Sequence, residues 1–346
     1  MNLVLLGYPD TERSEYFLKA AGELGVKVRF VKGPSFATEG EESCPAEDFD
    51  FSQLENSFAK VDPPLLNCHI ESMNSVMGSY CGFLQKLSSV PGLRLLNSSD
   101  AIKDTLDKVV CKKKLQKAGL SVTPFLAGER DFAGIVSESQ LKELMLKKKR
   151  YQVFVKPRFG SGSAGVIAYR LNPKTGKSII ETSASLKDGR LINTRKLRKI
   201  SDPALVDGII SRVFGSGAIV ETWIPKASYN GKTYDLRAVF QFGRIEYMVA
   251  RKSGGPVTNL HLNNDALPVE DLALGPGFMA ELETLCRKAA LLFPGLNVAG
   301  FDILLEKEGR KPRIIEINGQ GDLIYMDILA ENRIYKAQIR AMKNFN

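Results

Sequence analysis

Short apolar runs alternate with an amphipathic stretch at the start of the chain. Asn2–Leu6 is an apolar run of strand length, and Lys27–Val31 is a second one. Between them, Glu12–Leu24 carries apolar residues at i, i+4 and i+7, which is the spacing of one face of a helix. Strand, helix and strand in this order predict a parallel sheet.

The same reasoning extends this unit to residue 97. Strands are expected at Leu65–Ile70 and Leu93–Leu96, and Asn74–Leu87 has a helical pattern between them. These segments complete a first domain over residues 1–97. Ala101–Ala118 is expected to form one helix directly after it.

The rest of the chain combines amphipathic helices with pairs of strands around short turns. Apolar residues recur at helical spacing in four segments, and glycine-containing turns separate apolar runs in three others. The expected elements are helices over Glu138–Lys148, Pro203–Phe214, Phe278–Phe293 and Asp327–Met342, a strand over Ala218–Thr222, and hairpins over 178–193, 234–250 and 300–317.

The composition is that of a globular protein. Of 346 residues, 44% are apolar and 25% are charged. No apolar run approaches the roughly 20 residues of a membrane span, and the first residues lack the basic region of a signal peptide. The five cysteines are odd in number and have no metal-binding spacing, so we expect a cytoplasmic protein with reduced thiols. With only His69 and His261, a histidine-rich zinc site is excluded.

The formal net charge of +9 is unevenly distributed. Basic residues cluster at Lys147–Arg150 and again at Arg190–Lys199. Aromatic residues do not interleave with either cluster, which disfavours nucleic-acid binding. An anionic small molecule or a solvated basic face fits these clusters better.

Val298–Asp322 contains the most informative pattern. Two apolar segments flank a turn around Gly309 and predict a β-hairpin that places Asp302 opposite Glu316. Asn318 lies on the same face as Glu316, because side chains alternate along a strand. Facing carboxylates destabilise a sheet unless a cation neutralises them, and this all-oxygen set suits magnesium shared with phosphates. A solvated hairpin with scattered charges is the alternative.

The second informative segment is Val153–Ala168. A β-rich run ends at Lys156, and a loop containing Gly160, Gly162 and Gly165 follows. Small residues let a backbone approach a ligand, and successive N–H groups can form an anion site that the Lys156 ammonium could share. The segment is not a Walker loop, and the first strand–helix unit lacks the dinucleotide-binding fingerprint. A plain glycine-rich turn is the alternative.

Two further features have structural explanations of their own. The only tryptophan, Trp223, suits a core or interface ring. Asp235 and Arg237 share one face of a predicted strand, as a structural ion pair would. Neither feature identifies a function by itself.

Taken together, these residues resemble the ATP-grasp superfamily of carboxylate–amine ligases. The family's parts occur in order over Asn97–Asp322: a helix lysine, Lys108, then Lys156 before the glycine loop, the linker strand V-E-T-W-I, and the D…E-x-N set. The chain looks most like the branch of the ribosomal-protein S6 glutamate ligase and the lysine-biosynthesis ligase, through D-L-R at 235–237 and T-N-L-H at 258–261. Its G-Y-P-D opening is also similar to that of an uncharacterised bacterial ATP-grasp group.

The resemblance implies a fold and a domain order. A parallel α/β domain over residues 1–97 would precede a two-lobed α+β ATP-grasp fold. The central lobe, with a glycine-rich lid loop, would cover residues 98–222. The C-terminal lobe, with a metal site, would cover residues 223–346.

It also implies cofactors and residue roles. ATP and Mg²⁺ would bind, with two magnesium ions bridged by Glu316 and with Mn²⁺ as a substitute. Backbone groups at Glu221–Ile224 would bind the adenine, and Asp235 the ribose. The catalytic residues would be Lys156, Arg237 and Asn259, the metal ligands Asp302, Glu316 and Asn318, and the nucleotide-binding residues Lys108, Lys156, Gly160, Ser161, Gly162, Ser163, Gly165, Glu221, Thr222, Trp223, Ile224 and Asp235.

The chain departs from the family pattern at four places. Thr222 stands where a second acidic residue is common, and Pro225–Tyr234 is longer than the family's segment before the Asp235 position. His261 is followed by leucine and asparagines instead of arginine and two glycines. Gly319–Asp322 replaces a Ser-Pro-Gly type turn that borders the acceptor, so we expect an unusual acceptor pocket.

The implied reaction transfers the γ-phosphoryl group of ATP to a carboxylate, and an amine then displaces phosphate from the acyl-phosphate. Such a transfer depends on positioning and charge neutralisation, so no nucleophilic serine or cysteine is needed. The expected partners are small-molecule or peptide carboxylates and amines, without nucleic acid or membrane, and relatives often form homo-oligomers. Two alternatives stay open: a phosphotransferase acting on an anionic small molecule, which the basic segment around 190–200 would suit, and a non-catalytic nucleotide-binding accessory protein.

Overall fold

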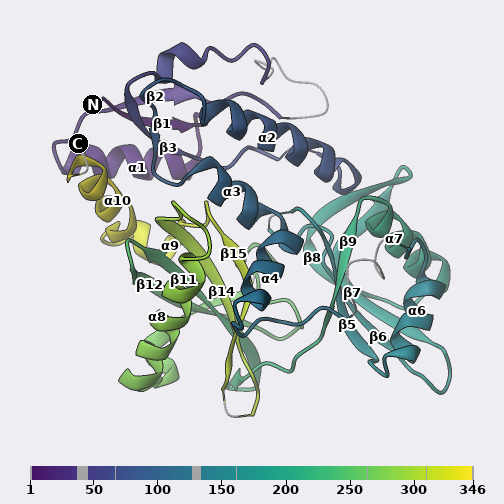
Figure 1. Cartoon of the computed structure of the whole chain (residues 1–346). Coiled ribbons are helices and arrows are strands. Elements are labelled where there is room, and N and C mark those ends of the chain that lie inside the picture. Colours follow the sequence, from purple (N-terminus) through teal and green to yellow (C-terminus); the bar gives the residue numbers. More distant parts are fainter. Residues whose placement is uncertain are drawn as a thin grey trace.

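The computed structural model describes residues 2–36, 46–66, 68–126, 134–160, 162–262, 264–308 and 310–344. Figure 1 shows three β-sheets in this part of the chain, with helices packed beside them. The first sheet is parallel, and the two that follow are antiparallel. This arrangement confirms the predicted α/β unit followed by a two-lobed α+β region. The boundaries after residues 97 and 222 stay predictions. No helix in the described ranges is both long and apolar enough to cross a membrane.

The first sheet has the order β2-β1-β3-β4. Its central strand β1 is buried on both faces, because Val4 and Leu6 pack against α2 while Leu3 and Leu5 pack against α1 and the C-terminal helix. The elements are β1 (Asn2–Gly7), α1 (Glu12–Glu23), β2 (Val28–Lys32), η1 (Phe51–Leu54), β3 (Ser57–Val61), η2 (Ile70–Ser72), α2 (Met73–Leu87) and β4 (Arg94–Leu95).

One predicted strand of this sheet was wrong. The described residues among 65–70 form no strand, and Leu65 is exposed. The sheet instead uses Ser57–Val61, whose five residues are all buried. Ser57 and Lys60 are polar, so the segment shows neither the alternation nor the apolar run that marks a strand.

The helix predicted over Ala101–Ala118 is two helices, α3 (Ser99–Leu106) and α4 (Lys108–Lys117). Asp107 interrupts them in an extended conformation, and its carboxylate accepts hydrogen bonds from the amides of Val109 and Val110. Helical periodicity does not reveal such a break, because a side chain that caps an internal turn keeps both halves in register. Lys108 is therefore the first residue of α4.

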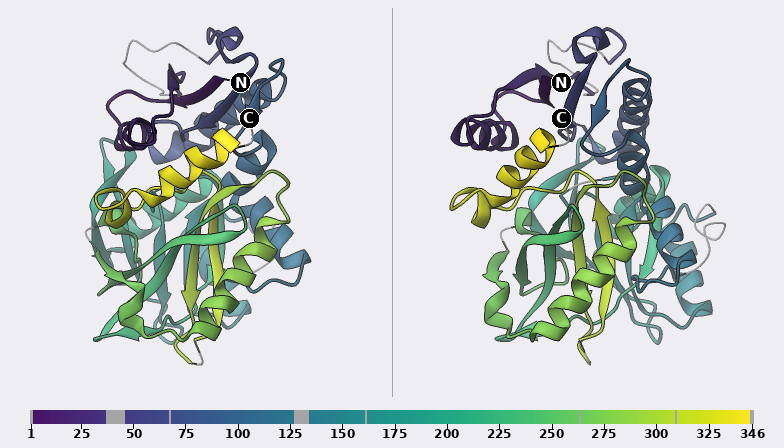
Figure 2. Two further views of the ribbon diagram at one scale, coloured as in Figure 1. Left: turned by 90° about the vertical axis from the view of Figure 1, so that its left-hand side faces the viewer. Right: turned by 60° about the vertical axis from the view of Figure 1, so that its left-hand side comes forward.

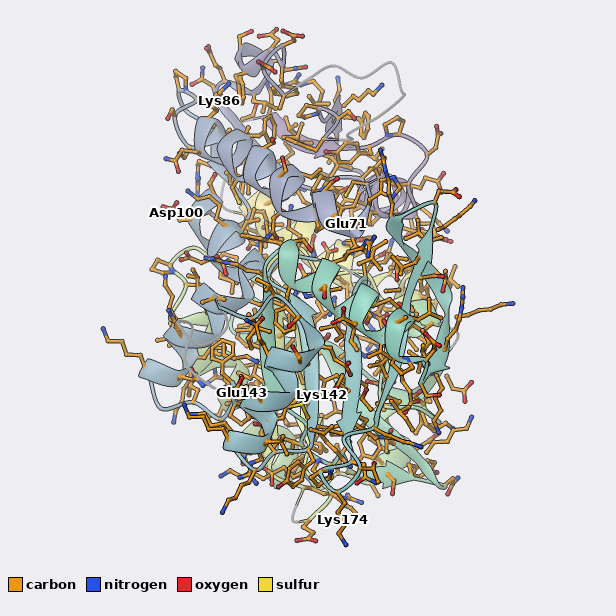
Figure 3. The ribbon with its side chains drawn as sticks, turned by 90° about the vertical axis from the view of Figure 1, so that its right-hand side faces the viewer. Glu71, Lys86, Asp100, Lys142, Glu143 and Lys174 are labelled. Carbon is orange, nitrogen blue, oxygen red and sulfur yellow. The ribbon has the colours of Figure 1, made fainter. Side chains whose placement is uncertain are left out.

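The central sheet has the order β8-β7-β6-β5-β9, with α6 and α7 covering one face (Figures 1 and 3). Lys142 and Glu143 lie on α6, and Lys174 lies in the loop between β6 and β7 (Figure 3). Glu71, which precedes α2, accepts a hydrogen bond from the backbone amide of Leu191 at 2.7 Å. The elements are α6 (Glu138–Lys147), β5 (Gln152–Pro157), β6 (Ile167–Leu171), β7 (Ser178–Lys187), β8 (Arg190–Ile200), α7 (Pro203–Gly215) and β9 (Ala218–Thr222).

The C-terminal sheet has the order β13-β12-β11-β14-β15, and β10 also pairs with β11. The apolar face of α8 packs on it, as Leu282, Cys286 and Ala289 are buried against strand residues such as Phe301. The elements are β10 (Ser228–Tyr229), β11 (Lys232–Gln241), β12 (Arg244–Ser253), η3 (Leu260–Leu262), β13 (Asp265–Pro268), η4 (Val269–Leu272), α8 (Pro276–Ala290), β14 (Val298–Leu305) and β15 (Pro312–Asn318).

The chain ends by returning to the first sheet. The single helix predicted over Asp327–Met342 is divided into α9 (Tyr325–Ile328) and α10 (Arg333–Asn344), because Asn332 adopts a left-handed conformation between them. Both views in Figure 2 place α10 beside α1, and the rings of Phe17 and Tyr335 meet edge to face at 5.7 Å. The first sheet is thereby held against the C-terminal one.

Candidate active site

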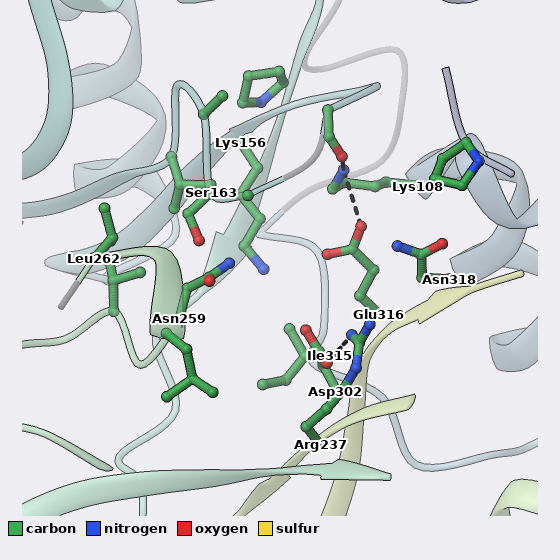
Figure 4. Close-up of a pocket in the computed structure, with 18 of the residues that line it drawn as sticks. Lys108, Lys156, Ser163, Arg237, Asn259, Leu262, Asp302, Ile315, Glu316 and Asn318 are labelled. Atoms are coloured by element: carbon green, nitrogen blue, oxygen red, sulfur yellow. Dashed lines mark hydrogen bonds and ion pairs between the residues drawn. The ribbon is translucent and has the colours of Figure 1, made fainter. Parts of the chain in front are cut away.

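A cleft of about 800 Å³ lies where the three sheets meet. Fourteen of the predicted site residues line it, and several are shown in Figure 4. Gly165 and Trp223 do not line the cleft, and Ser161 is outside the described residues. The lining members are Lys108, Lys156, Gly160, Gly162, Ser163, Glu221, Thr222, Ile224, Asp235, Arg237, Asn259, Asp302, Glu316 and Asn318.

The hairpin of β14 and β15 has the predicted register. Asp302 pairs with Glu316, and Gly300 pairs with Asn318. On the other side of β14, Arg237 of β11 lies opposite Asp302. The Arg237 Nη1 atom donates to Asp302 Oδ1 at 2.7 Å, and Arg251 Nη2 lies 3.1 Å from Asp302 Oδ2. Burial would raise the pKa of Asp302, but the two guanidinium groups outweigh it and lower the pKa to about 2.

Glu316 and Asn318 complete the oxygen-rich patch. Glu316 Oε1 lies 3.1 Å from Lys108 Nζ, and Asn318 Oδ1 accepts a hydrogen bond from the backbone amide of Gln320 at 3.0 Å. Among the described residues, no three His, Cys, Asp or Glu side chains cluster as a metal site would require. Two carboxylates and an amide oxygen nevertheless fit magnesium that shares its ligands with nucleotide phosphates. The metal assignment stays a prediction.

Glu221 is buried between two lysines. Its Oε2 atom lies 2.7 Å from Lys156 Nζ and accepts from Thr123 Oγ1 at 3.0 Å, and its Oε1 atom pairs with Lys112 Nζ. Burial alone would raise the pKa of Glu221, but Lys112 and Lys156 lower it to about 2. The Glu221 carboxylate therefore orients the lysines, and only its backbone is left for a base.

Lys112 was missed as a site residue because it begins a run of three lysines that suits a solvated face. The residue is 3% exposed, and its Nζ atom donates to Thr123 Oγ1 at 2.9 Å. Burial lowers its pKa to about 8 despite the opposing effect of Glu221. The spacing along the helix does indicate a site position for Lys112, since it lies four residues after Lys108 and so shares its helix face.

In the linker, the amides of Thr222 and Trp223 donate to backbone carbonyls of Pro124 and Gln152. The Trp223 ring packs on the central sheet, 4.8 Å from the Phe154 ring, with the Arg170 guanidinium 4.7 Å from its centroid. This packing matches the structural explanation of the tryptophan. Ile224 is the apolar residue of the linker that lines the cleft.

Asp235 is 2% exposed, and both of its carboxylate oxygens have partners inside the protein. Arg251 Nε donates to Oδ1 at 2.8 Å, while Lys226 Nζ (3.2 Å) and the Thr258 hydroxyl donate to Oδ2. Burial opposes ionisation, but Arg251 and Lys226 lower the pKa of Asp235. Asp235 thus positions Arg251, which also bridges to Asp302. Ribose binding by this carboxylate would require an exchange of partners, and that role stays a prediction.

The glycine loop lies over Lys108. Its Gly160 carbonyl accepts a hydrogen bond from Lys108 Nζ at 3.2 Å, and Figure 4 shows Ser163 of the loop facing Asn259. Gly165 has a φ of +69°, and an added Cβ would lie 2.7 Å from Pro157 Cγ, so only glycine fits there. Gly165 supports the loop from outside the cleft.

The arrangement of the three sheets around the cleft matches solved structures that have the ATP-grasp ligase fold. No protein-family model matches the sequence, and no curated protein matches it significantly. Solved structures match it in full, however. The macrocyclase MdnC from Microcystis aeruginosa MRC, bound with precursor peptide MdnA, shares 13% identity over 100% of both chains with a TM-score of 0.60.

Two further structures support the same fold. The ATP-grasp ligase PsnB, complexed with a minimal precursor, shares 13% identity over 100% of both chains with a TM-score of 0.55. The N5-carboxyaminoimidazole synthase from Aspergillus clavatus, in complex with ADP and 5-aminoimidazole ribonucleotide, shares 13% identity over 99% of this chain and 77% of its own, with a TM-score of 0.58. At this identity the likeness shows the fold, and the narrower branch predicted from the sequence stays a prediction.

Proposed function

We propose that this protein is an ATP-dependent ligase that joins a carboxylate to an amine through an acyl-phosphate and releases ADP and phosphate. The observation that carries this proposal is the hairpin register, which sets Asp302 opposite Glu316 in the same cleft as Lys108 and Lys156. Solved relatives in fold support it, because PsnB structures contain ADP with Mg or AMPPNP.

The nucleotide would bind with its adenine beside Ile224 and its phosphates under the glycine loop. Lys156 and Lys108 reach this region from β5 and α4, and each is paired with a carboxylate in this structure. Nucleotide phosphates would compete for the same ammonium groups, since charge-assisted hydrogen bonds to phosphate are strong. The fixed lysines would then hold the phosphoryl group in place.

Asp302, Glu316 and Asn318 would hold magnesium, which neutralises phosphate charge when bound. Arg237 and Arg251 face the same carboxylate, Asp302, and so lie where negative charge would develop on the transferring group. Such preorganised cations lower the barrier to phosphoryl transfer without forming a covalent bond to it. The glycine loop would exclude water from the acyl-phosphate.

The acceptors in this proposal are a carboxylate and an amine on small molecules or peptides. Peptides are supported by the relatives in fold, because MdnC and PsnB were solved with precursor peptides. Activation converts the carboxylate and ATP into an acyl-phosphate and ADP. Attack by the amine then forms the amide and releases phosphate and a proton.

Hydroxylamine tests this chemistry because it can take the place of the unidentified amine. In the presence of Mg-ATP and a panel of carboxylates, it should convert the acyl-phosphate into a hydroxamate that forms a coloured iron(III) complex. The Lys156→Ala variant should form none. Formation of ADP without a hydroxamate from any carboxylate, together with a phosphorylated acceptor, would contradict the ligase and favour a phosphotransferase.

A further inference from the structure

The cleft extends past the β14–β15 hairpin to the carboxyl ends of β1 and β3. The walls of this far end come from Thr11–Arg13 after β1, Asp62–Leu66 after β3, and Gln320 with Leu323–Tyr325 after β15. In the order β2-β1-β3-β4, the chain reverses its winding direction at β1. In open parallel sheets, ligands bind outside the carboxyl ends of the strands at such a reversal. None of the residues predicted to bind the nucleotide lies in this part of the cleft.

The charges at the two ends of the cleft differ in sign. The nucleotide end is lined by five cations and four carboxylates, whereas Glu12, Arg13 and Asp62 line the far end. Arg13 is paired with Asp322, and Asp62 with Lys60. Among the residues that the structure describes, no cationic side chain pairs with Glu12, whose Oε2 accepts a hydrogen bond from the Tyr325 hydroxyl at 2.6 Å. The far end therefore presents one uncompensated negative charge.

The side-chain oxygen of Gln320 is a second hydrogen-bond acceptor at this end. Gln320 is 6% exposed, and its Nε2 donates to the Val61 carbonyl at 2.9 Å and to the Tyr80 hydroxyl at 2.7 Å. Its Oε1 atom has no hydrogen-bond partner among the described residues. The amide cannot be reversed, because the Val61 carbonyl only accepts hydrogen bonds and so requires the Nε2 side. A buried oxygen left in this state favours a ligand that donates an N–H group.

The rim of the far end is apolar. Pro63, Pro64 and Leu65 line one side and Tyr325 another. Leu65 is 52% exposed and Tyr325 is 41% exposed, although both are large apolar side chains. Exposed apolar groups that gather at the mouth of a cleft are typical of ligand contacts.

We propose that this far end binds the amine substrate, and that this amine carries an apolar group. An amine is mostly protonated at neutral pH, so its binding site must receive an ammonium ion. Glu12 supplies the charge, Gln320 Oε1 accepts an N–H, and Leu65 contacts the apolar group. Glu15 lies beside Glu12 in the first turn of α1, so two acidic side chains stand at this end of the helix and disfavour an anionic ligand. The inference rests on the proposed ligase function and specifies one of its substrates.

Calorimetric titration of the full chain with leucinamide tests the inference. Leucinamide has an ammonium group, an amide and an apolar side chain, but no carboxylate. Glu12→Gln should weaken its binding about tenfold, the effect of losing one charge-assisted contact. Glu15→Gln, on the same helix but outside the cleft, is the matched control and should leave the affinity unchanged. Leu65→Ser should weaken leucinamide and leave glycinamide unchanged.

Two results would overturn the inference. These are absence of leucinamide binding to the unaltered protein, and equal leucinamide affinities of Glu12→Gln and the unaltered protein. Titration with Mg-ADP separates these outcomes from failure of the ligase proposal. Intact Mg-ADP binding beside a failed leucinamide test rejects only the amine site, whereas absence of Mg-ADP binding rejects the ligase.

Discussion

At the scale of single residues, the cleft is a set of ion pairs that a nucleotide would rearrange. Lys108 pairs with Glu316, Lys156 with Glu221, and Arg237 with Asp302. Each cation therefore has a partner before any phosphate arrives, which avoids an uncompensated buried charge. The same pairing keeps the donors in place for the phosphates.

Lys156→Ala and Glu316→Ala should each lower turnover by at least about 100-fold, the typical cost of removing one preorganised charge from a transferring group. Both variants should stay folded, because Glu221 keeps Lys112 as a partner and Glu316 is only partly buried. Steady-state ADP release measures the loss of turnover, and far-UV circular dichroism shows whether each variant is folded. Near-normal activity in either variant would contradict the site assignment.

Glu221 should make stability depend on acid pH. Its pKa is lowered from 4.5 to about 2 in the folded chain, so its contribution is complete above about pH 4.5 and is lost as the pH falls toward 2. Glu221→Gln should cost a few kcal/mol at pH 7, because Lys112 and Lys156 lose their counter-charge. Urea unfolding should show this difference shrinking between pH 4.5 and pH 3. A difference independent of pH would contradict the assignment, and the exposed Glu281→Gln is the control.

At the scale of elements, the β14–β15 hairpin depends on a glycine at position 300. An added Cβ at Gly300 would lie 2.2 Å from the Gly321 carbonyl oxygen and 2.6 Å from the Arg237 guanidinium, which itself donates to that carbonyl at 3.1 Å. Absence of a side chain at Gly300 thus allows Arg237 to lie flat between β14 and the loop after β15.

Gly300→Ala should therefore displace Arg237 and lower turnover at least about tenfold, with a stability cost of about 1–3 kcal/mol. Gly277→Ala in α8 is the control, because its added Cβ meets nothing within 4 Å, and it should lose neither activity nor stability. Turnover and denaturant unfolding measured on both variants test the claim. Equal activities would show that Arg237 tolerates displacement.

The sequence predicted those elements whose pattern is local. The pairing of β14 with β15, the position of Asp302 opposite Glu316, and the helices α1 and α2 all follow from apolar spacing and turn residues, although Gly309 itself lies outside the described residues. The break at Asp107 and the strand at Ser57–Val61 do not, because a side-chain cap and two buried polar residues leave no periodic signal.

The sequence contains only part of the information on which residues pair with the site carboxylates. Arg251 lies opposite Asp235 in a hairpin around Gly243, and the two positions are equally far from that glycine. Its simultaneous contact with Asp302 needs the neighbour β14, whose place beside β11 depends on long-range pairing. The sequence did not predict the proposed amine-binding end, since Glu12, Leu65 and Gln320 are far apart along the chain and only the fold brings them to one end of the cleft.

At the scale of the whole molecule, a buried ionic cluster joins the first sheet to the loop after β15. Asp322 pairs with Arg13, lies 3.2 Å from Lys60 Nζ, and accepts from Gln338 of α10 at 3.3 Å. Lys60 also lies 5.4 Å from the ring centroids of Phe17 and Tyr335. Segments from both ends of the chain therefore meet at one carboxylate.

Asp322→Asn should destabilise the whole protein by about 3–5 kcal/mol, because it removes the carboxylate that pairs with Arg13 and leaves Lys60 with Asp62 alone. Asp265→Asn is the control, since the Asp265–Lys232 pair is exposed and should cost less than about 1 kcal/mol. Chemical denaturation of both variants measures the two effects. A small effect at Asp322 would mean that the first sheet is held by apolar packing alone.

The most direct test of the ligase follows ADP and free phosphate together. The protein receives Mg-ATP and a pool of small carboxylates, amines and peptides, with Glu316→Ala as the control. Our account predicts equal release of ADP and phosphate that requires both a carboxylate and an amine and is absent from the variant. ADP without free phosphate would contradict it and leave the phosphoryl group on an acceptor, as in a phosphotransferase.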